Sequence, residues 1–186
     1  MAPIEVVFGI VVFVFALIGL GRGFLKELGV TTVMVLLLFF LSRFDPYLDG
    51  AIVKGIAVID ITATVEQARL VQCWVLIFII VGATFLSYHG ETLAFAGHLT
   101  QGVQAILLGL LAGTLNGYLV AGSVWYYMDK FDYPIRWLGF APDQLSEAAR
   151  TTVRYLPLGF LGQPAVLGES LLLYLTVFLI IIRVIR

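Results

Sequence analysis

The sequence predicts an all-α fold, a polytopic transmembrane helical bundle of four to five spans with an interfacial amphipathic helix. Hydrophobic residues make up 61% of the 186-residue chain and charged residues only 12%, far from the composition of soluble domains. Several long apolar runs also carry no charge and are long enough to cross the ~30 Å hydrocarbon core of a bilayer. The chain is therefore expected to form one membrane domain, residues 1–186.

Residues 101–128 are expected to form the central helix of this bundle. Small residues recur there at every fourth position, which places them on one helix face. In lipid, such a face lets two backbones approach closely, whereas apolar burial gives no driving force for association. Glycine is also common in membrane helices in general, but five small residues in register favour a packing face. An amide deep in this helix should hydrogen-bond to a neighbour. The predicted packing residues are Ala105, Gly109, Gly113, Asn116, Gly117 and Ala121.

The expected spans, in chain order, are residues 4–21, 27–43, 70–88, 102–127 and 169–185. The first two are so close that they must form an antiparallel hairpin. Arg22 and Lys26 in their connection lie four apart, so on a helix they would share a face and could reach lipid phosphates. The last run is barely long enough to span.

Two surface segments are expected, at residues 44–69 and 129–168. The apolar pieces of the first are too short to span, which favours an interfacial or re-entrant segment. In the second, Pro142 should open a helix of roughly a dozen residues, because proline favours the first helical position. Its apolar and charged stripes predict an amphipathic helix that lies on the membrane or on a partner. The residues of this docking surface are Leu145, Ala149, Arg150, Val153 and Arg154.

No motif indicates an enzyme. His89 and His98 are nine residues apart, so they do not share a helix face as the ligands of a metal site do. Glu91 lies near His89, but a further ligand is not evident, and we predict no metal site. Gly19 to Gly23 has the look of a phosphate-binding loop but follows no strand. A net charge of −1 without a basic run argues against a nucleic-acid partner.

A transporter would need ionisable or strongly polar groups inside the membrane, on a substrate path. The sequence shows none in the middle of an expected span. No inverted repeat is visible either. Transport by a single copy is therefore not expected, whereas a pore built from several copies stays open as an alternative.

Two stretches together resemble the colicin V production protein family (CvpA-like), which are small bacterial inner-membrane proteins. The first holds an early acidic residue and the hairpin signature R-G-F-x-[KR]-E within residues 19–28. The second, residues 102–131, matches the glycine-rich helix of the family with its aromatic end and final acidic residue. The resemblance covers about residues 1–135. Its hairpin residues are Glu5, Arg22, Gly23, Phe24, Lys26 and Glu27.

The chain departs from the family in two places. The family commonly has basic residues before and inside its fourth helix, where this chain is uncharged at residues 99–101 and 114–116. The family also usually ends in a polar tail, whereas this chain adds the apolar run 171–186. The resemblance implies no enzymatic reaction, only broad links to bacteriocin secretion, envelope integrity and purine-related operons.

The resemblance also bears on location and orientation. A raw count of basic residues favours an N-terminus inside, but that rule is strongest for short loops and for the first helix. The resemblance implies that the R-G-F hairpin faces the cytoplasm. We therefore predict a multi-pass protein of the bacterial cytoplasmic (inner) membrane, with its N-terminus outside and its C-terminus inside.

The expected function is that of a non-catalytic integral membrane scaffold or accessory subunit. It would pack against and stabilise a larger membrane complex, such as a photosynthetic or respiratory one. Its partners would be membrane lipids and other integral membrane subunits, or a second copy of itself. No cofactor is predicted, although 14 phenylalanines and 8 tyrosines would suit a lipid, quinone or pigment at subunit contacts. The alternatives are a CvpA-like envelope or secretion protein, or a small transporter or channel.

Overall fold

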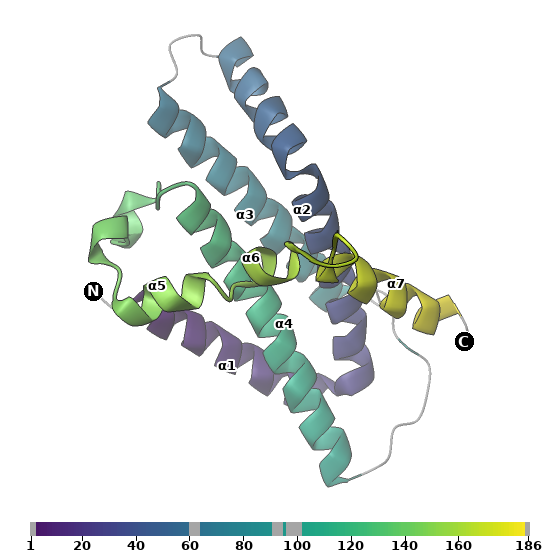
Figure 1. Cartoon of the computed structure of the whole chain (residues 1–186). Helices are drawn as coiled ribbons and strands as arrows, with labels where there is room; N and C mark the ends of the chain where they lie inside the picture. The colour runs from purple at the N-terminus through teal and green to yellow at the C-terminus, as the bar shows by residue number, and fades with distance from the viewer. Residues whose placement is uncertain (1–2, 60–63, 91–94, 96–101, 185–186) are drawn as a thin grey trace.

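The fold rests on four long apolar helices, seen in a computed structural model that describes residues 3–59, 64–90, 95 and 102–184. Each of the four is long and apolar enough to cross a membrane. The all-α transmembrane class predicted from the composition is therefore confirmed. The helices are α1 (Ile4–Arg22), α2 (Phe24–Ile59), α3 (Val65–His89) and α4 (Val103–Lys130), as Figure 1 shows.

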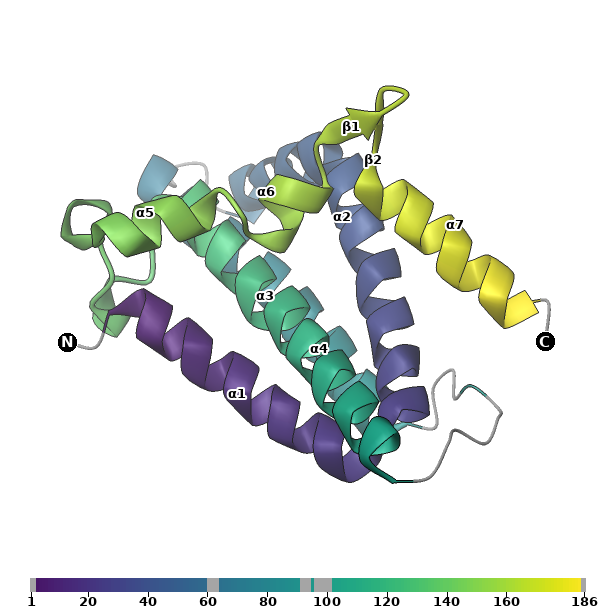
Figure 2. The same cartoon turned by 60° about the horizontal axis from the view of Figure 1, so that its bottom comes forward.

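A series of short elements follows α4 and leads to one last helix. In Figure 2, α5 and α6 lie across α4, and the small antiparallel hairpin of β1 and β2 then leads into α7, which contacts α2. These elements are η1 (Arg136–Leu138), η2 (Pro142–Gln144), α5 (Glu147–Val153), α6 (Pro157–Leu161), β1 (Pro164–Val166), β2 (Glu169–Ser170) and α7 (Leu171–Val184).

Helix α4 is the centre of the structure, since it contacts α1, α2, α3, α5 and α6. Its closest contact is with α1, which runs antiparallel to it. A Cβ atom built on Gly117 would lie 2.8 Å from the Cα of Val12, and one on Gly109 would lie 2.7 Å from the carbonyl oxygen of Gly19. The two backbones therefore touch along the glycine face, in the manner that small residues permit.

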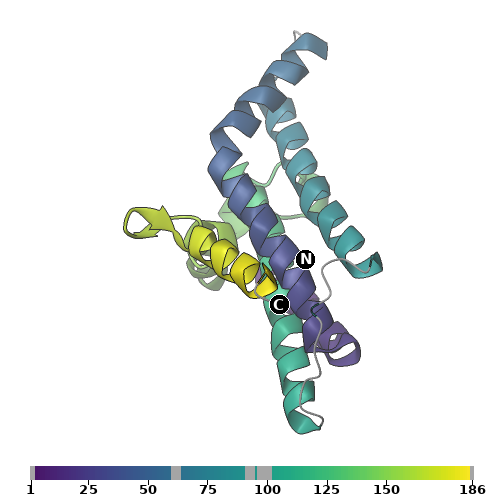
Figure 3. The ribbon, with the colours of Figure 1, turned by 90° about the vertical axis from the view of Figure 1, so that its right-hand side faces the viewer.

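Helix α2 differs from the expected span 27–43, because it continues as one helix of 36 residues to Ile59. Figure 3 shows α2 and α3 extending together at one end of the molecule. Pro46 lies inside α2 and would normally disfavour a helix interior. Tertiary contacts outweigh it, since Lys130 of α4 binds Asp45 and Asp49 at 2.7 Å on either side of Pro46. Most of the expected surface segment 44–69 is therefore helical, and α3 begins at Val65.

The C-terminal elements are shorter than expected. Pro142 opens only a single turn, η2, and α5 is a helix of seven residues rather than about a dozen. Leu145 breaks the two apart with an extended backbone (ψ 131°). Helix α7 has 14 residues, so it is about 21 Å long and shorter than the ~30 Å hydrocarbon core.

Candidate functional site: a buried carboxylate shared by four helices

The turn between α1 and α2 positions the site. Gly23 alone joins the two helices, with φ 82° and ψ 158°, a conformation that essentially only glycine adopts. Its N–H donates to the carbonyl of Gly19 at 3.0 Å, and its own carbonyl accepts from the N–H of Glu27 at 3.2 Å. Arg22, the last residue of α1, and Glu27, in the first turn of α2, are therefore adjacent.

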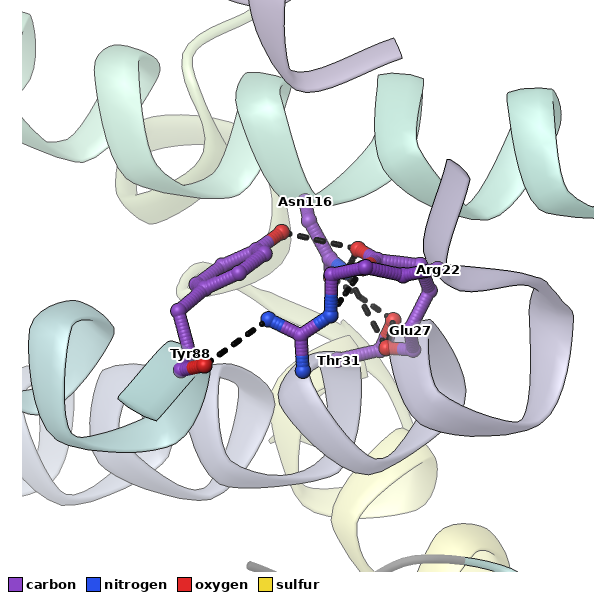
Figure 4. Close-up of polar contacts among 5 residues, drawn as sticks. All are labelled: Arg22, Glu27, Thr31, Tyr88 and Asn116. Carbon is purple, nitrogen blue, oxygen red and sulfur yellow. Dashed lines mark hydrogen bonds and ion pairs between the residues drawn. The ribbon is translucent and has the colours of Figure 1, made fainter. Parts of the chain in front are cut away.

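The Glu27 carboxylate is the central group, and it is completely buried. Its Oε1 lies 3.3 Å from Nε of Arg22. Its Oε2 accepts hydrogen bonds from the hydroxyl of Tyr88 at 2.7 Å and from Nδ2 of Asn116 at 2.8 Å. Figure 4 shows these side chains converging from different helices. One carboxylate on α2 thus binds α1, α3 and α4.

Asn116 has no polar atom left over in this cluster. Its Nδ2 also donates to the backbone carbonyl of Glu27 at 3.0 Å, and its Oδ1 accepts from the Thr31 hydroxyl at 2.7 Å. This is the bond to a neighbouring helix that its position in the sequence predicts. Asn116 stands at the midpoint of α4, thirteen residues after Val103 and fourteen before Lys130, or about 20 Å from either end.

Arg22 also contacts Tyr88 of α3. Its Nη1 donates to the carbonyl of Tyr88 at 3.2 Å, and its guanidinium carbon lies 4.3 Å from the centre of the Tyr88 ring. Tyr88 is the penultimate residue of α3, so the guanidinium also stands at the negative end of that helix dipole. The Arg22 side chain is 24% exposed, whereas that of Glu27 is fully covered.

The donors around Glu27 suit an ionised carboxylate, which can only accept hydrogen bonds. A buried charge is tolerated when it has both an ion-pair partner and further hydrogen bonds, and removing one partner is costly. The arrangement therefore does two things chemically: it holds a negative charge among apolar helices, and it links four helices through that charge.

A second polar cluster lies at the C-terminal end of α4. Lys130 Nζ binds Oδ2 of Asp45 and Oδ2 of Asp49, both at 2.7 Å, and Nε2 of Gln72 lies 3.4 Å from Oδ1 of Asp49. α2, α3 and α4 are thus joined at this end too. Burial raises the pKa of the nearby Tyr133 phenol, which accepts a hydrogen bond from Trp125 at 2.9 Å.

The packing residues predicted on α4 do not all lie in one contact. Gly109, Gly113 and Gly117 are buried against α1, and Asn116 points to Glu27 instead. Ala105 and Ala121 are only half-buried. Because α1 of the same chain covers the glycine face, that face is not available to another subunit.

The hairpin residues also separate into two groups. Arg22, Gly23 and Glu27 build the cluster, whereas Lys26 is exposed and Phe24 is half-buried. Arg22 ends α1 and Lys26 lies in α2, so the prediction that they share one helix face is wrong. Glu5 lies elsewhere, at the start of α1, where it accepts a hydrogen bond from the Ser146 hydroxyl at 2.5 Å.

The expected docking surface is largely turned inwards. Ala149 is completely buried, and Leu145 and Val153 are half-buried against the hydrophobic core. Only Arg150 and Arg154 are exposed. The apolar stripe therefore packs within the chain, because α5 lies against α1 and α4.

The histidines give no metal centre in the part of the chain that the structure describes. His89 stacks on Phe85, with ring centres 3.9 Å apart, while His98 and Glu91 lie outside the described residues. The described residues contain no group of three or more histidine, cysteine, aspartate or glutamate side chains that could hold a metal ion.

Sequence reasoning missed the buried carboxylate. Glu27 lies in the first turn of α2 rather than in the middle of its span, yet its carboxylate is completely buried and bonded to Asn116 at the midpoint of α4. Glu27 stands beside Lys26 at the start of its helix, and that position along the chain does not show that its side chain is buried. The available signal was the unpaired amide of Asn116, which needed a polar partner inside the membrane.

Comparisons with known proteins do not identify this site. No protein family, no curated protein and no solved structure matches the chain. The resemblance to the CvpA-like family therefore stays a prediction that rests on the hairpin and glycine motifs.

Proposed function

We propose that this chain is a non-catalytic integral membrane protein that works by packing, as a scaffold or accessory subunit of a larger membrane complex. The observation that carries the proposal is the contrast between its interior and its surface. The polar groups of the Glu27 cluster bind one another and hold the chain's own helices together. The outward faces of the apolar helices carry large, uncovered hydrophobic side chains.

Helix α1 illustrates the uncovered surface. One of its faces packs against the glycines of α4, and the other carries Ile10 and Phe13, which are 57% and 62% exposed. On α3, Phe78 and Leu86 are each 66% exposed. Such faces meet either lipid tails or other transmembrane helices, so the partners would be lipids, other membrane subunits or a second copy of the chain. A lipid, quinone or pigment would be accommodated at these contacts.

Purification of a tagged chain in a mild detergent tests the proposal. We expect other membrane subunits, or further copies of the chain, to co-elute in a fixed ratio when analysed by native mass spectrometry. An absorption spectrum of the same sample would reveal a bound pigment. Phe13→Ala should weaken the association and leave the unfolding midpoint unchanged, since Phe13 is exposed. A chain that stays monomeric at every detergent and protein concentration would refute the proposal.

A second candidate function is the movement of a proton or another ion through the membrane, and the buried Glu27 favours it. Ionisable residues inside membrane segments often mark such paths. Flux into liposomes that is abolished in Glu27→Gln, with the four-helix fold intact, would support this candidate over a packing role. Equal flux in Glu27→Gln and the wild type would remove Glu27 from any transport path. The envelope or secretion role implied by the resemblance is compatible with either function, in a bacterial cytoplasmic membrane with the N-terminus outside.

A further inference from the structure

A cavity of about 260 Å³ lies between α2, the C-terminal part of α4, α6 and the segment that follows α6. It stands at the polar end of α4, where the chain leaves the apolar helix at Lys130. The lining residues that matter here are Ser42, Asp45, Tyr126, Tyr127, Leu158 and Pro164. Cavities of this kind, part apolar with a few converging polar groups, are typical ligand sites.

Two residues that line this cavity each have a buried polar atom without a hydrogen-bond partner among the described residues. One is Oδ1 of Asp45, whose Oδ2 binds Lys130. The other is the hydroxyl of Tyr127, a side chain with 0% exposure. A buried polar group without a partner carries its full desolvation penalty, and a charged one carries more. Both atoms therefore call for a ligand that brings hydrogen bonds.

The net negative charge beside the cavity favours a cation as its ligand. Asp45 and Asp49 share the single ammonium of Lys130, so these three groups together carry a formal charge of −1. Among the described residues that line the cavity, Asp45 is the only carboxylate, and its free oxygen can accept from an N–H donor. The Tyr126 and Tyr127 rings add aromatic faces, which attract cations.

A primary ammonium fits this cavity better than a bare metal ion. Ca²⁺ is held mainly by carboxylate and carbonyl oxygens, six to eight in number, whereas the described lining has a single carboxylate, that of Asp45. The Ser42 hydroxyl already donates to the carbonyl of Phe39 at 3.0 Å. Leu158 and Pro164 supply apolar wall instead. The ligand therefore combines an N–H donor, a positive charge and a carbon skeleton.

A second cavity of about 410 Å³ adjoins the first and shares Ser42, Gly162 and Pro164 with it. Arg43 and Glu169 both line it, so its charges balance, whereas the first cavity is negative. A guanidinium is a good partner for a phosphate. A headgroup with its ammonium in the first cavity would thus find a cation for its phosphate in the second.

We propose that this pair of cavities binds the headgroup of phosphatidylethanolamine, with the primary ammonium at Asp45 and Tyr127 and the phosphate at Arg43. Tyrosines are enriched at the level of lipid headgroups, which agrees with Tyr126 and Tyr127 at this end of α4. The site is separate from the Glu27 cluster and does not depend on a partner subunit.

Native mass spectrometry of the full chain in mild detergent tests the proposal. The chain is mixed with equal amounts of phosphatidylethanolamine, phosphatidylcholine and phosphatidylglycerol that carry the same acyl chains. We expect phosphatidylethanolamine to be retained preferentially, because the choline headgroup has no N–H to donate and the glycerol headgroup has no cation. Equal retention of the ethanolamine and choline lipids would overturn the proposal.

Matched variants locate the binding. Tyr127→Phe removes only the unpaired hydroxyl and leaves the Lys130 contacts in place, so we expect a several-fold loss of retention while the unfolding midpoint does not fall. Asp45→Asn should weaken retention by about tenfold or more. Asp49→Asn removes the same charge beside Lys130 but does not line the cavity, so it should keep the preference for ethanolamine. Equal losses in Asp45→Asn and Asp49→Asn would overturn the assignment to this cavity.

A free amine and a lipid headgroup carry the same ammonium group, so a further experiment is needed to distinguish them. It uses two ammonium salts and one more variant. Ethylammonium chloride should raise the unfolding midpoint at constant ionic strength, and tetramethylammonium chloride should not. Arg43→Gln should lower retention of phosphatidylethanolamine and leave the ethylammonium effect unchanged. An ethylammonium effect without any lipid preference would overturn the lipid and leave a soluble amine as the ligand.

Discussion

Gly19→Ala should disrupt the contact between α1 and α4. A Cβ atom at this position would lie 2.7 Å from the Cα and 2.9 Å from the N of Gly113, and closer still to the carbonyl oxygen of Gly109. These are backbone atoms, so no side-chain rotation can relieve the overlap. The two helices must therefore move apart.

The size of the effect follows from two opposing contributions. Overpacking costs about 1–3 kcal/mol, and the better helix propensity of alanine offsets about 1 kcal/mol of this. Separation at Gly19 also opens the contacts of Gly113 and Gly117 further along the same face. We therefore expect a net loss of about 1–2 kcal/mol, or about 5- to 30-fold in the unfolding equilibrium.

The assay is unfolding of the purified chain in mild detergent micelles by increasing dodecyl sulfate. Trp125 of α4 is 2% exposed and packs on Phe8 of α1, with ring centres 5.5 Å apart. With Trp74 and Trp137 replaced by Phe in every variant, the fluorescence of Trp125 reports on this contact. The matched control is Gly9→Ala on the same helix, where a Cβ would meet nothing within 4 Å. Equal unfolding midpoints for Gly19→Ala and Gly9→Ala would refute the reasoning.

Three further variants test the polar contacts by the same unfolding assay or by hydrogen exchange. Asn116→Leu removes a hydrogen-bond donor from the buried Glu27 and should lower the free energy of unfolding by about 1–3 kcal/mol. Its control is Thr114→Val, which removes an exposed hydroxyl that bonds only within its own helix. The control should change stability by less than about 0.5 kcal/mol. Lys130→Met leaves two partly buried carboxylates without their cation and should lower the free energy of unfolding by about 3–5 kcal/mol. Its control, Arg69→Met, breaks the exposed pair with Asp132 and should cost less than about 1 kcal/mol. Ser146→Ala removes the N-cap of α5 and the bond to Glu5, so it should destabilise α5 by about 1 kcal/mol, seen as faster amide exchange in α5. If Asn116→Leu or Lys130→Met is as stable as its control, that contact does not contribute to stability as proposed. Unchanged amide exchange in Ser146→Ala would contradict the role of the N-cap.

Local pattern determined a large part of this protein. Runs of apolar residues set the membrane class and the existence of four long helices, because a helix in lipid must satisfy its backbone internally and needs only length and hydrophobicity. The four-residue spacing of small residues at Gly109, Gly113 and Gly117 likewise defined a face on which another backbone could pack. These properties lie within single segments, so they can be read along the chain.

Tertiary structure decided what those segments meet. Glu27 and its partners Tyr88 and Asn116 are 61 and 89 residues apart, and no local pattern shows that they share a site. The length of α2 was also decided by distant contacts, since Lys130 holds Asp45 and Asp49 across a proline. The physical reason is the same in both cases: a charge buried among apolar helices takes its partners from whichever helices lie beside it, and only the packed fold places those helices.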